Sequence, residues 1–291
     1  MTPSDIEQLV ERVQAQLSPE LLRAARWVVA HPVAMALESM RRCARSAEVS
    51  PATMTRLARQ LGLEGYEALR EPYRRALAGR AAVRDEAAYA ERARAQRNTL
   101  QGGVLLDALH DTQVANLRRG AELNAPQEIL ASAGLMLRSR SVAFLGLRAS
   151  FGIAHHLHYT FGLLSPTGRL LQDLAGALPD QVEALGPEDV LVAVSQAPYT
   201  RQTVEAVQSA VRAGVPVLAL TDSRLSPIAQ GARHVLLFST TSASFFPSQT
   251  GAQALAETLV AAVVAVGDAT LIDHLAARQE RLRSRKAYWE R

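Results

Sequence analysis

Cysteine and lysine are almost absent from this sequence of 291 residues. Cys43 is the only cysteine, which excludes a disulfide within the chain and a zinc site built from several thiolates. Lys286 is the only lysine, so arginine supplies nearly all of the 32 basic side chains. Long apolar runs are missing as well, since the longest, Leu259–Val266, is far too short to cross a bilayer. The first residues do not resemble a signal peptide, and we expect a cytoplasmic protein that contacts no membrane.

The composition does provide enough apolar material for folded domains. Hydrophobic residues make up 48% of the chain, and its length suits two domains of ordinary size. The net charge of +4 and the pI near 9.6 are mildly basic. This charge is compatible with nucleic-acid binding but does not require it.

Residues 39–62 have the pattern of two short helices joined by a turn. Ser39 and Ser50 each stand where a side chain can cap the start of a helix. Pro51 follows at a first helical position, where its missing N–H costs nothing, and Gly62 follows the last periodic residue. We interpret this stretch as a helix-turn-helix.

The second helix of this pair has an apolar face and a free face. Met54, Leu57, Ala58 and Leu61 make the apolar face. The free face carries small hydroxyls near its start, two arginines and no acid, as a helix in the major groove requires. We expect DNA contacts from Arg41, Arg42, Ser50, Ala52, Thr53, Thr55, Arg56 and Arg59. Arg56 should read a base, and Arg41 and Arg42 should neutralise phosphates. The alternative is an ordinary antiparallel helix pair whose arginines are only solvated.

From residue 141 onward, short apolar runs alternate with segments of helical periodicity. The expected strands are 142–146, 169–171, 190–195, 215–221 and 234–238. The expected helices are 151–164, 174–184, 200–213, 225–231 and 249–267. This alternation predicts an α/β domain whose parallel sheet is flanked by helices. We therefore divide the chain into an all-α helix-turn-helix domain of about five helices at 1–78, a helical linker at 79–125 and the α/β domain at 126–291.

Three of the expected strands end in residues suited to an anionic ligand. Gly146 is followed by Ser150, Ser195 by Thr200, and Thr221 by Ser226. In parallel sheets, ligands bind beyond the carboxyl ends of the strands, beside helix N-termini that favour negative charge. The structural alternative is that these hydroxyls only cap helices.

With both halves considered, the chain resembles the RpiR family of bacterial transcriptional regulators. The resemblance rests on V-S-P-A-T-M-T-R-L-A-R-Q-L-G-L-E-G-Y at 49–66, G-L-R-A-S at 146–150, S-Q-A-P-Y-T-R-Q-T at 195–203 and T-D-S-R-L-S-P-I-A at 221–229. It implies an N-terminal helix-turn-helix joined to a sugar isomerase (SIS) domain that senses phosphorylated sugars. It also implies an effector site at Ser150, Ser195 and Thr200, with a DNA operator as the partner. We expect Arg148 to add positive charge at that site.

Two loops depart from the pattern of that family. SIS domains usually show S-x-S-G-x-T, and here Ala197 and Pro198 replace the second serine and the glycine. Alanine lacks the hydroxyl and proline lacks the backbone donor. The first loop has Leu147 and Arg148 where glycine is usual. A phosphorylated sugar, a related sugar acid and a non-phosphorylated ligand therefore all remain open.

A few other side chains are candidates for chemistry. His155 and His158 share a helix face, and Glu257 stands where the general base of an isomerase could reach a cleft. We expect packing or capping roles for the histidines and a surface or capping role for Glu257, with no metal, no cofactor and no enzymatic activity. The expected function is a ligand-responsive regulator that binds double-stranded DNA as a homodimer or homotetramer. The alternative is a SIS-type sugar-phosphate isomerase or lyase with the helical domain as an interaction module.

Overall fold

The computed structural model describes residues 3–79, 89–99 and 103–289. The chain forms two compact units, residues 1–95 and 96–291. The first is helical and the second contains all strands of the described residues.

The described residues 3–79 of the first unit form six α-helices. They are α1 (Pro3–Val13), α2 (Pro19–Ala30), α3 (Pro32–Leu37), α4 (Met40–Ser46), α5 (Pro51–Gln60) and α6 (Tyr66–Gly79). The sequence predicted about five helices there, because His31-Pro32 was taken as a plain helix end. Pro32 instead opens α3, which suits proline at a first helical position.

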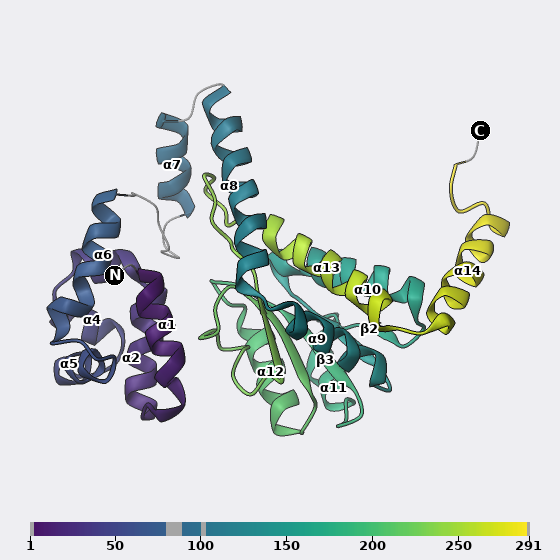
Figure 1. The fold of residues 1–291 in the computed structure, drawn as a ribbon, viewed down its shortest axis with the longest axis horizontal. Coiled ribbons are helices and arrows are strands. Elements are labelled where there is room, and N and C mark those ends of the chain that lie inside the picture. The colour runs from purple at the N-terminus through teal and green to yellow at the C-terminus, as the bar shows by residue number, and fades with distance from the viewer. Residues whose placement is uncertain (1–2, 80–88, 100–102, 290–291) are drawn as a thin grey trace. The chain divides into compact units, whose positions relative to one another are not determined.

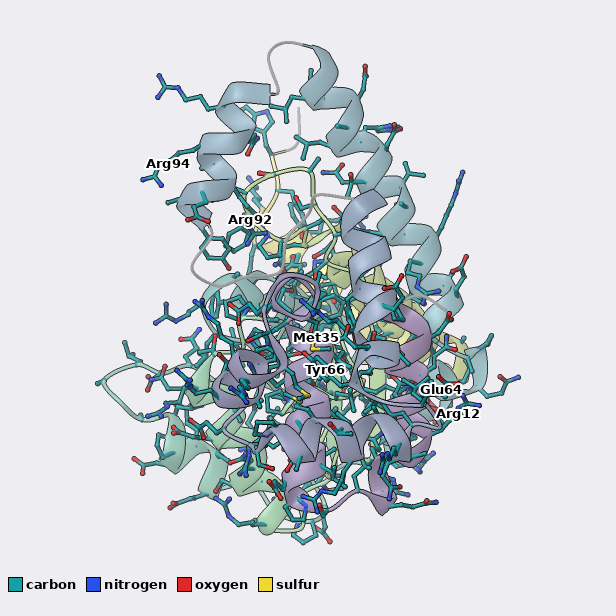
Figure 2. The ribbon with its side chains drawn as sticks, turned by 90° about the vertical axis from the view of Figure 1, so that its left-hand side faces the viewer. Arg12, Met35, Glu64, Tyr66, Arg92 and Arg94 are labelled. Carbon is teal, nitrogen blue, oxygen red and sulfur yellow. The ribbon has the colours of Figure 1, made fainter. Side chains whose placement is uncertain are left out.

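The core of the first unit is closed by contacts between α3 and α6. Met35 and Tyr66 are buried, and the Tyr66 hydroxyl points to the Met35 sulfur at 3.7 Å (Figure 2). Arg70 donates from Nε to the carbonyl oxygen of Met35 at 3.1 Å and from Nη2 to that of Ala36 at 3.3 Å. These bonds satisfy carbonyls at the end of a short helix that has no partners for them within itself. Cys43 is fully buried, as expected for a small core residue.

Two helices separate the first six helices from the α/β fold along the sequence: α7 (Tyr89–Thr99) and α8 (Gly103–Leu123). The sequence assigned residues 79–125 to a linker, part of which lies outside the described residues. The structure builds α8 into the second unit instead. Asn116 of α8 donates to the carbonyl oxygen of Thr241 at 2.7 Å and accepts from the Ser239 hydroxyl at 2.7 Å. Asn124 exchanges two bonds of 2.7 Å with the backbone of Leu237.

The second unit is built on a five-stranded parallel sheet of order β2-β1-β3-β4-β5. The strands are β1 (Val142–Leu145), β2 (Gly168–Leu170), β3 (Val190–Val194), β4 (Val217–Thr221) and β5 (His234–Leu237). All five were predicted, with ends that differ by a few residues. The continuous apolar character of β1, β3 and β4 follows from their burial on both faces.

Helices cover both faces of this sheet (Figure 1). The core on one face joins strand residues such as Phe144 and Val192 to α9 (Pro126–Arg138), α10 (Phe151–Leu164), α13 (Thr250–Val266) and α14 (Ala269–Ser284). The core on the other face joins the alternate strand residues to α11 (Leu178–Glu183) and α12 (Arg201–Arg212). The predicted helix at 225–231 is wrong, because those residues form only turns.

A buried carboxylate joins the amino ends of three neighbouring strands. Asp189 precedes β3 and is fully buried. It accepts from Arg140 at 3.0 and 2.6 Å, from the Ser141 hydroxyl at 2.7 Å and from the Gly186 N–H at 2.9 Å. Arg169 of β2 lies 3.8 Å away. These donors, Arg140 first, hold the pKa of the Asp189 carboxyl far below its ordinary value.

No single helix among the described residues is both long enough and apolar enough to span a membrane. Taken together, α13 and α14 meet that length and composition test, but the chain bends by 118° between them.

Candidate functional site

The helix pair predicted at 39–62 is present as α4 and α5. The Ser39 hydroxyl accepts from the N–H of Arg42, and the Ser50 hydroxyl accepts from the N–H of Thr53. Glu48 forms the turn with φ of +55°, and Gly62 follows α5 with φ of +78°. Met54, Leu57, Ala58 and Leu61 are buried, as the predicted apolar face requires. Both caps, the turn and the buried face are thus confirmed.

Most of the predicted contact residues lie on the exposed side of this pair. Ala52, Arg56 and Arg59 of α5 are exposed, as are Arg41 and Arg42 of α4. Thr55 is half-buried, and its hydroxyl is directed to the Met40 sulfur at 3.7 Å and to the Pro51 carbonyl oxygen at 3.5 Å. Arg42 also pairs through Nε with Glu38 at 3.3 Å. The exposed cations on these two helices form a surface that phosphates can neutralise.

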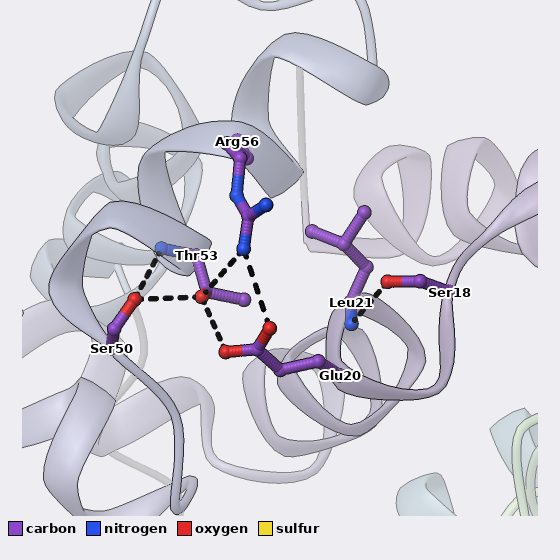
Figure 3. Close-up of polar contacts among 6 residues, drawn as sticks. All are labelled: Ser18, Glu20, Leu21, Ser50, Thr53 and Arg56. Atoms are coloured by element: carbon purple, nitrogen blue, oxygen red, sulfur yellow. Dashed lines mark hydrogen bonds and ion pairs between the residues drawn. The ribbon is translucent and has the colours of Figure 1, made fainter.

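Thr53 does not lie on this surface, and the prediction that it does is wrong. Its side chain is fully buried. Its hydroxyl donates to Oε1 of Glu20 at 2.7 Å and lies 2.8 Å from the Ser50 hydroxyl. Glu20 also accepts from Nη2 of Arg56 at 3.3 Å through its other oxygen (Figure 3). The free face therefore has an acid beside it after all, supplied by α2 rather than by α5.

The other predicted residues lie at the carboxyl edge of the parallel sheet. β1 pairs directly with β3, and Leu145 is the partner of Ala193. The loops that carry Ser150 and Ser195 therefore leave neighbouring strands at the same edge. Both serines are buried, and Thr200 is half-buried at the start of α12. The predicted adjacency of these two strands is confirmed.

Helix capping does not account for the hydroxyls at this edge. Ser150 precedes α10 and Thr200 precedes α12, but neither side chain makes a capping hydrogen bond. Three buried polar atoms between residues 196 and 226 have no hydrogen-bond partner among the described residues. They are Oε1 of Gln196, Oγ1 of Thr203 and Oγ of Ser226. Because an unpaired buried polar atom is costly, such atoms indicate a place where a ligand or water binds.

The first loop makes a close approach that only glycine allows. A Cβ on Gly146 would lie 2.5 Å from the carbonyl oxygen of Ser150 and 3.0 Å from Cβ of Ala154. Arg148 follows in the left-handed region, with φ of +52°, and its side chain is exposed. The departure noted in the sequence is therefore a non-glycine residue in a conformation that glycine adopts more easily.

The second loop is tied to the loop after β4 by a carboxylate. Asp222 accepts from the Tyr199 hydroxyl at 2.8 Å and from the Ala197 N–H at 3.4 Å. Pro198 has no N–H to offer. Fewer backbone donors are therefore available to an anion here than in a loop with serine and glycine at these two positions.

The arrangement of a helix-turn-helix followed by this α/β fold corresponds to two described domain families. Residues 5–79 match the helix-turn-helix domain of the rpiR family, and residues 135–272 match the SIS domain. The chain belongs to the RpiR family.

Two relatives that align with most of this chain are named as regulators. A protein of Caldanaerobacter subterraneus subsp. tengcongensis, named as an uncharacterized HTH-type transcriptional regulator, is 25% identical over 251 residues, or 83% of either chain. HexR, a transcriptional regulator from Pseudomonas aeruginosa, is 27% identical over 77% of this chain and 76% of its own. The bifunctional protein glk of Paraburkholderia xenovorans is 28% identical over 79% of this chain, which spans 34% of that protein.

Solved structures show the same architecture. The sugar isomerase domain of an RpiR transcription factor from Sphaerobacter thermophilus has a TM-score of 0.58 and 27% identity, and covers 60% of this chain and 98% of its own. NanR from Vibrio vulnificus, solved with ManNAc-6P, has a TM-score of 0.59 over 95% of this chain and 98% of its own. At 19% identity, this second likeness shows the fold alone.

Sequence reasoning missed two side chains of this RpiR-family chain that the structure brings to its sites. Glu20 was missed because its partners Thr53 and Arg56 lie 33 and 36 residues further along. Gln196 stands inside the S-Q-A-P-Y-T motif, two residues past β3, and its burial continues the unbroken burial of that strand. Only the second could have been found from local pattern.

The histidines and the glutamate considered for catalysis have other surroundings. His158 packs edge-on against Phe144, with ring centroids 6.2 Å apart, and burial lowers the pKa of its imidazole. His155 is exposed. Glu257 is exposed on α13 and accepts from Gln253 at 2.8 Å. No cluster of three metal-binding side chains is present in the described part of the chain.

Proposed function

We propose that this chain regulates transcription by binding an operator through α4 and α5 and by sensing a small anionic sugar derivative in its SIS domain. The observation that carries the proposal is the exposed arginine face of α5, Arg56 and Arg59, on a helix capped and turned as a recognition helix requires. Exposed Arg41 and Arg42 on α4 supply the phosphate contacts of such an interface.

The effector site in this proposal is the carboxyl edge of the sheet. The anionic group of the effector binds at Ser150, Ser195 and Thr200, near the N-termini of α10 and α12, and Arg148 adds positive charge. A hydroxyl of the effector donates to Oε1 of Gln196, which has no donor among the described residues. NanR of Vibrio vulnificus was solved with ManNAc-6P, which supports a phosphorylated sugar as the first class to test.

The proposal does not include catalysis. Glu257, the residue considered as a base for an isomerase, is on the exposed surface of α13 and hydrogen-bonded to Gln253 within the same helix. An isomerase needs a general base within hydrogen-bond reach of the proton that it removes. The two relatives that this chain matches over 83% and 76% of their own length are named as regulators, which also supports a binding role.

One experiment tests both parts. The full-length protein is used to select duplexes from a random-sequence DNA library. Hexose 6-phosphates and sugar acids are then titrated by calorimetry against wild type, Ser150→Ala and Thr200→Val. The proposal expects an enriched duplex sequence and a ligand that binds wild type and is weakened by both variants. A ligand that binds all three proteins equally would place the effector site elsewhere. A selection that enriches no DNA sequence would contradict operator binding.

A further inference from the structure

Glu20 holds two side chains of the recognition helix at the same time. Its Oε1 accepts from the Thr53 hydroxyl at 2.7 Å, and its Oε2 accepts from Nη2 of Arg56 at 3.3 Å (Figure 3). Nη2 of Arg56 also donates to the Thr53 oxygen at 3.2 Å. The Thr53 hydrogen bond and then the Arg56 charge lower the pKa of the Glu20 carboxyl. The carboxylate is therefore ionised under ordinary binding conditions.

Both hydroxyl protons at the start of α5 are used in this arrangement. Thr53 donates its one proton to Glu20, and its oxygen accepts from Arg56 and from the Ser50 hydroxyl, which lies 2.8 Å away. The Ser50 oxygen accepts from the N–H of Thr53 at 3.1 Å. Neither hydroxyl proton remains for a base or a phosphate. Thr53 thus contacts Arg56 directly, and Ser50 contacts Thr53.

Only one nitrogen of the Arg56 guanidinium, Nη2, makes hydrogen bonds to the described residues. Its side chain is still 60% exposed, although Nη2 contacts both Glu20 and Thr53. A guanidinium has five N–H donors in a fixed plane, so fixing one nitrogen restricts the direction of the rest. Among the described residues, Nε and Nη1 have no hydrogen-bond partner.

We propose that Glu20 is a positioning residue for DNA readout, which directs the Arg56 guanidinium toward a base edge and so sets sequence discrimination rather than affinity. This inference rests on the proposed operator binding by α5. A carboxylate beside a DNA-binding face repels phosphates and weakens binding to any sequence. The acid is useful at this position only if the order that it gives to Arg56 outweighs that repulsion.

The test compares Glu20→Gln with wild type on two duplexes, one selected by the wild-type protein from a random library and one of scrambled sequence. The amide keeps the size of the side chain and can still accept from Thr53, so the cap of α5 is retained. We expect the ratio of the two affinities to fall about three- to tenfold, as loss of order in one long side chain implies. Binding to the scrambled duplex should stay the same or tighten.

Glu38→Gln is the matched control. Glu38 is also paired at 3.3 Å with an arginine of the motif, Arg42 of α4. Removing the negative charge of Glu38 should strengthen binding to both duplexes alike and leave the ratio of the two affinities unchanged. Repeating Glu20→Gln in an Arg56→Ala background separates positioning from folding. If Glu20 acts through Arg56, the second change leaves the ratio unaltered, whereas a role in the fold of the domain would lower it further.

The outcomes are distinct. An unchanged ratio for Glu20→Gln, or an equal loss with and without Arg56, overturns the positioning role. A wild-type protein that enriches no sequence overturns the proposed operator binding itself, before Glu20 is tested.

Discussion

At the scale of single residues, the side chains of the helix-turn-helix differ in how far the sequence alone predicts their positions. The caps Ser39 and Ser50 depend on neighbours three residues away, so they were predicted and are confirmed. Thr53 sits at a similar place on α5 but is buried by Glu20, 33 residues earlier in the chain. Helical spacing assigns a residue to a face, but tertiary contacts decide whether that face is covered.

Arg56→Ala should lose discrimination between the selected and a scrambled duplex by about 1–3 kcal/mol, because a bidentate arginine–base contact is worth that much. Arg41→Ala and Arg42→Ala should instead weaken binding to both duplexes alike. Each of these two should also reduce the slope of log affinity against log salt by about 1. Titrations by fluorescence anisotropy at several salt concentrations distinguish these effects. Full discrimination by a folded Arg56→Ala protein would exclude Arg56 as a base contact.

At the scale of elements, the order of strands and helices could be predicted from the apolar runs, but the structure of the loops could not. The burial of β1, β3 and β4 on both faces makes their sequences continuously apolar, and this pattern is local. The turns at 225–231 carry Leu225 and Ile228, both buried, which imitate a helix period. The role of Asp222 in the second loop could not be predicted either, because it depends on Tyr199 from a different strand end.

Gly146→Ala should destabilise the second unit by about 1–3 kcal/mol, because the new Cβ would lie 2.5 Å from a backbone oxygen of the next turn. The same change should weaken effector binding, since Ser150 carries that oxygen. Gly152→Ala in α10 is the control. A Cβ there has nothing within 4 Å, and alanine should be neutral or stabilise by up to about 1 kcal/mol. Urea unfolding of the two variants checks both expectations, and equal stability would show that the first loop adapts.

Asp189→Asn should cost about 3 kcal/mol at pH 7, because it leaves the arginines at the strand ends without their buried partner. The pKa of Asp189 is lowered in the folded state, so its contribution is present above the ordinary pKa and is lost as the pH falls below about 4. The stability difference between wild type and variant should therefore shrink below pH 4. Urea unfolding from pH 7 to pH 3 measures it. A constant difference over that range would contradict an ionised Asp189 as its cause.

At the scale of the whole molecule, we predict a dimer or tetramer. The apolar pattern of α13 assigns Leu255, Leu259, Val263 and Val266 to both the sheet and a partner. The first three are buried within their own unit, and Val266 is exposed. Exposed apolar side chains of the same unit remain for a partner: Leu130, Phe151, Tyr159, Val264, Val266 and Ile272. Light scattering should give a multiple of 31.4 kDa, and Val264→Asp should shift it toward the monomer. A monomeric wild type at micromolar concentration, with and without DNA, would rule the assembly out.

The central claim is that one chain couples an effector in the SIS domain to DNA binding by α5. The most direct measurement is the affinity of the full-length protein for a selected duplex, with and without each hexose 6-phosphate, in wild type and in Ser150→Ala. Coupling between two sites typically changes affinity by about 5- to 150-fold. We predict a change in that range for at least one compound with wild type, and none with Ser150→Ala at the same concentration. A duplex affinity that no compound alters in wild type would contradict the claim.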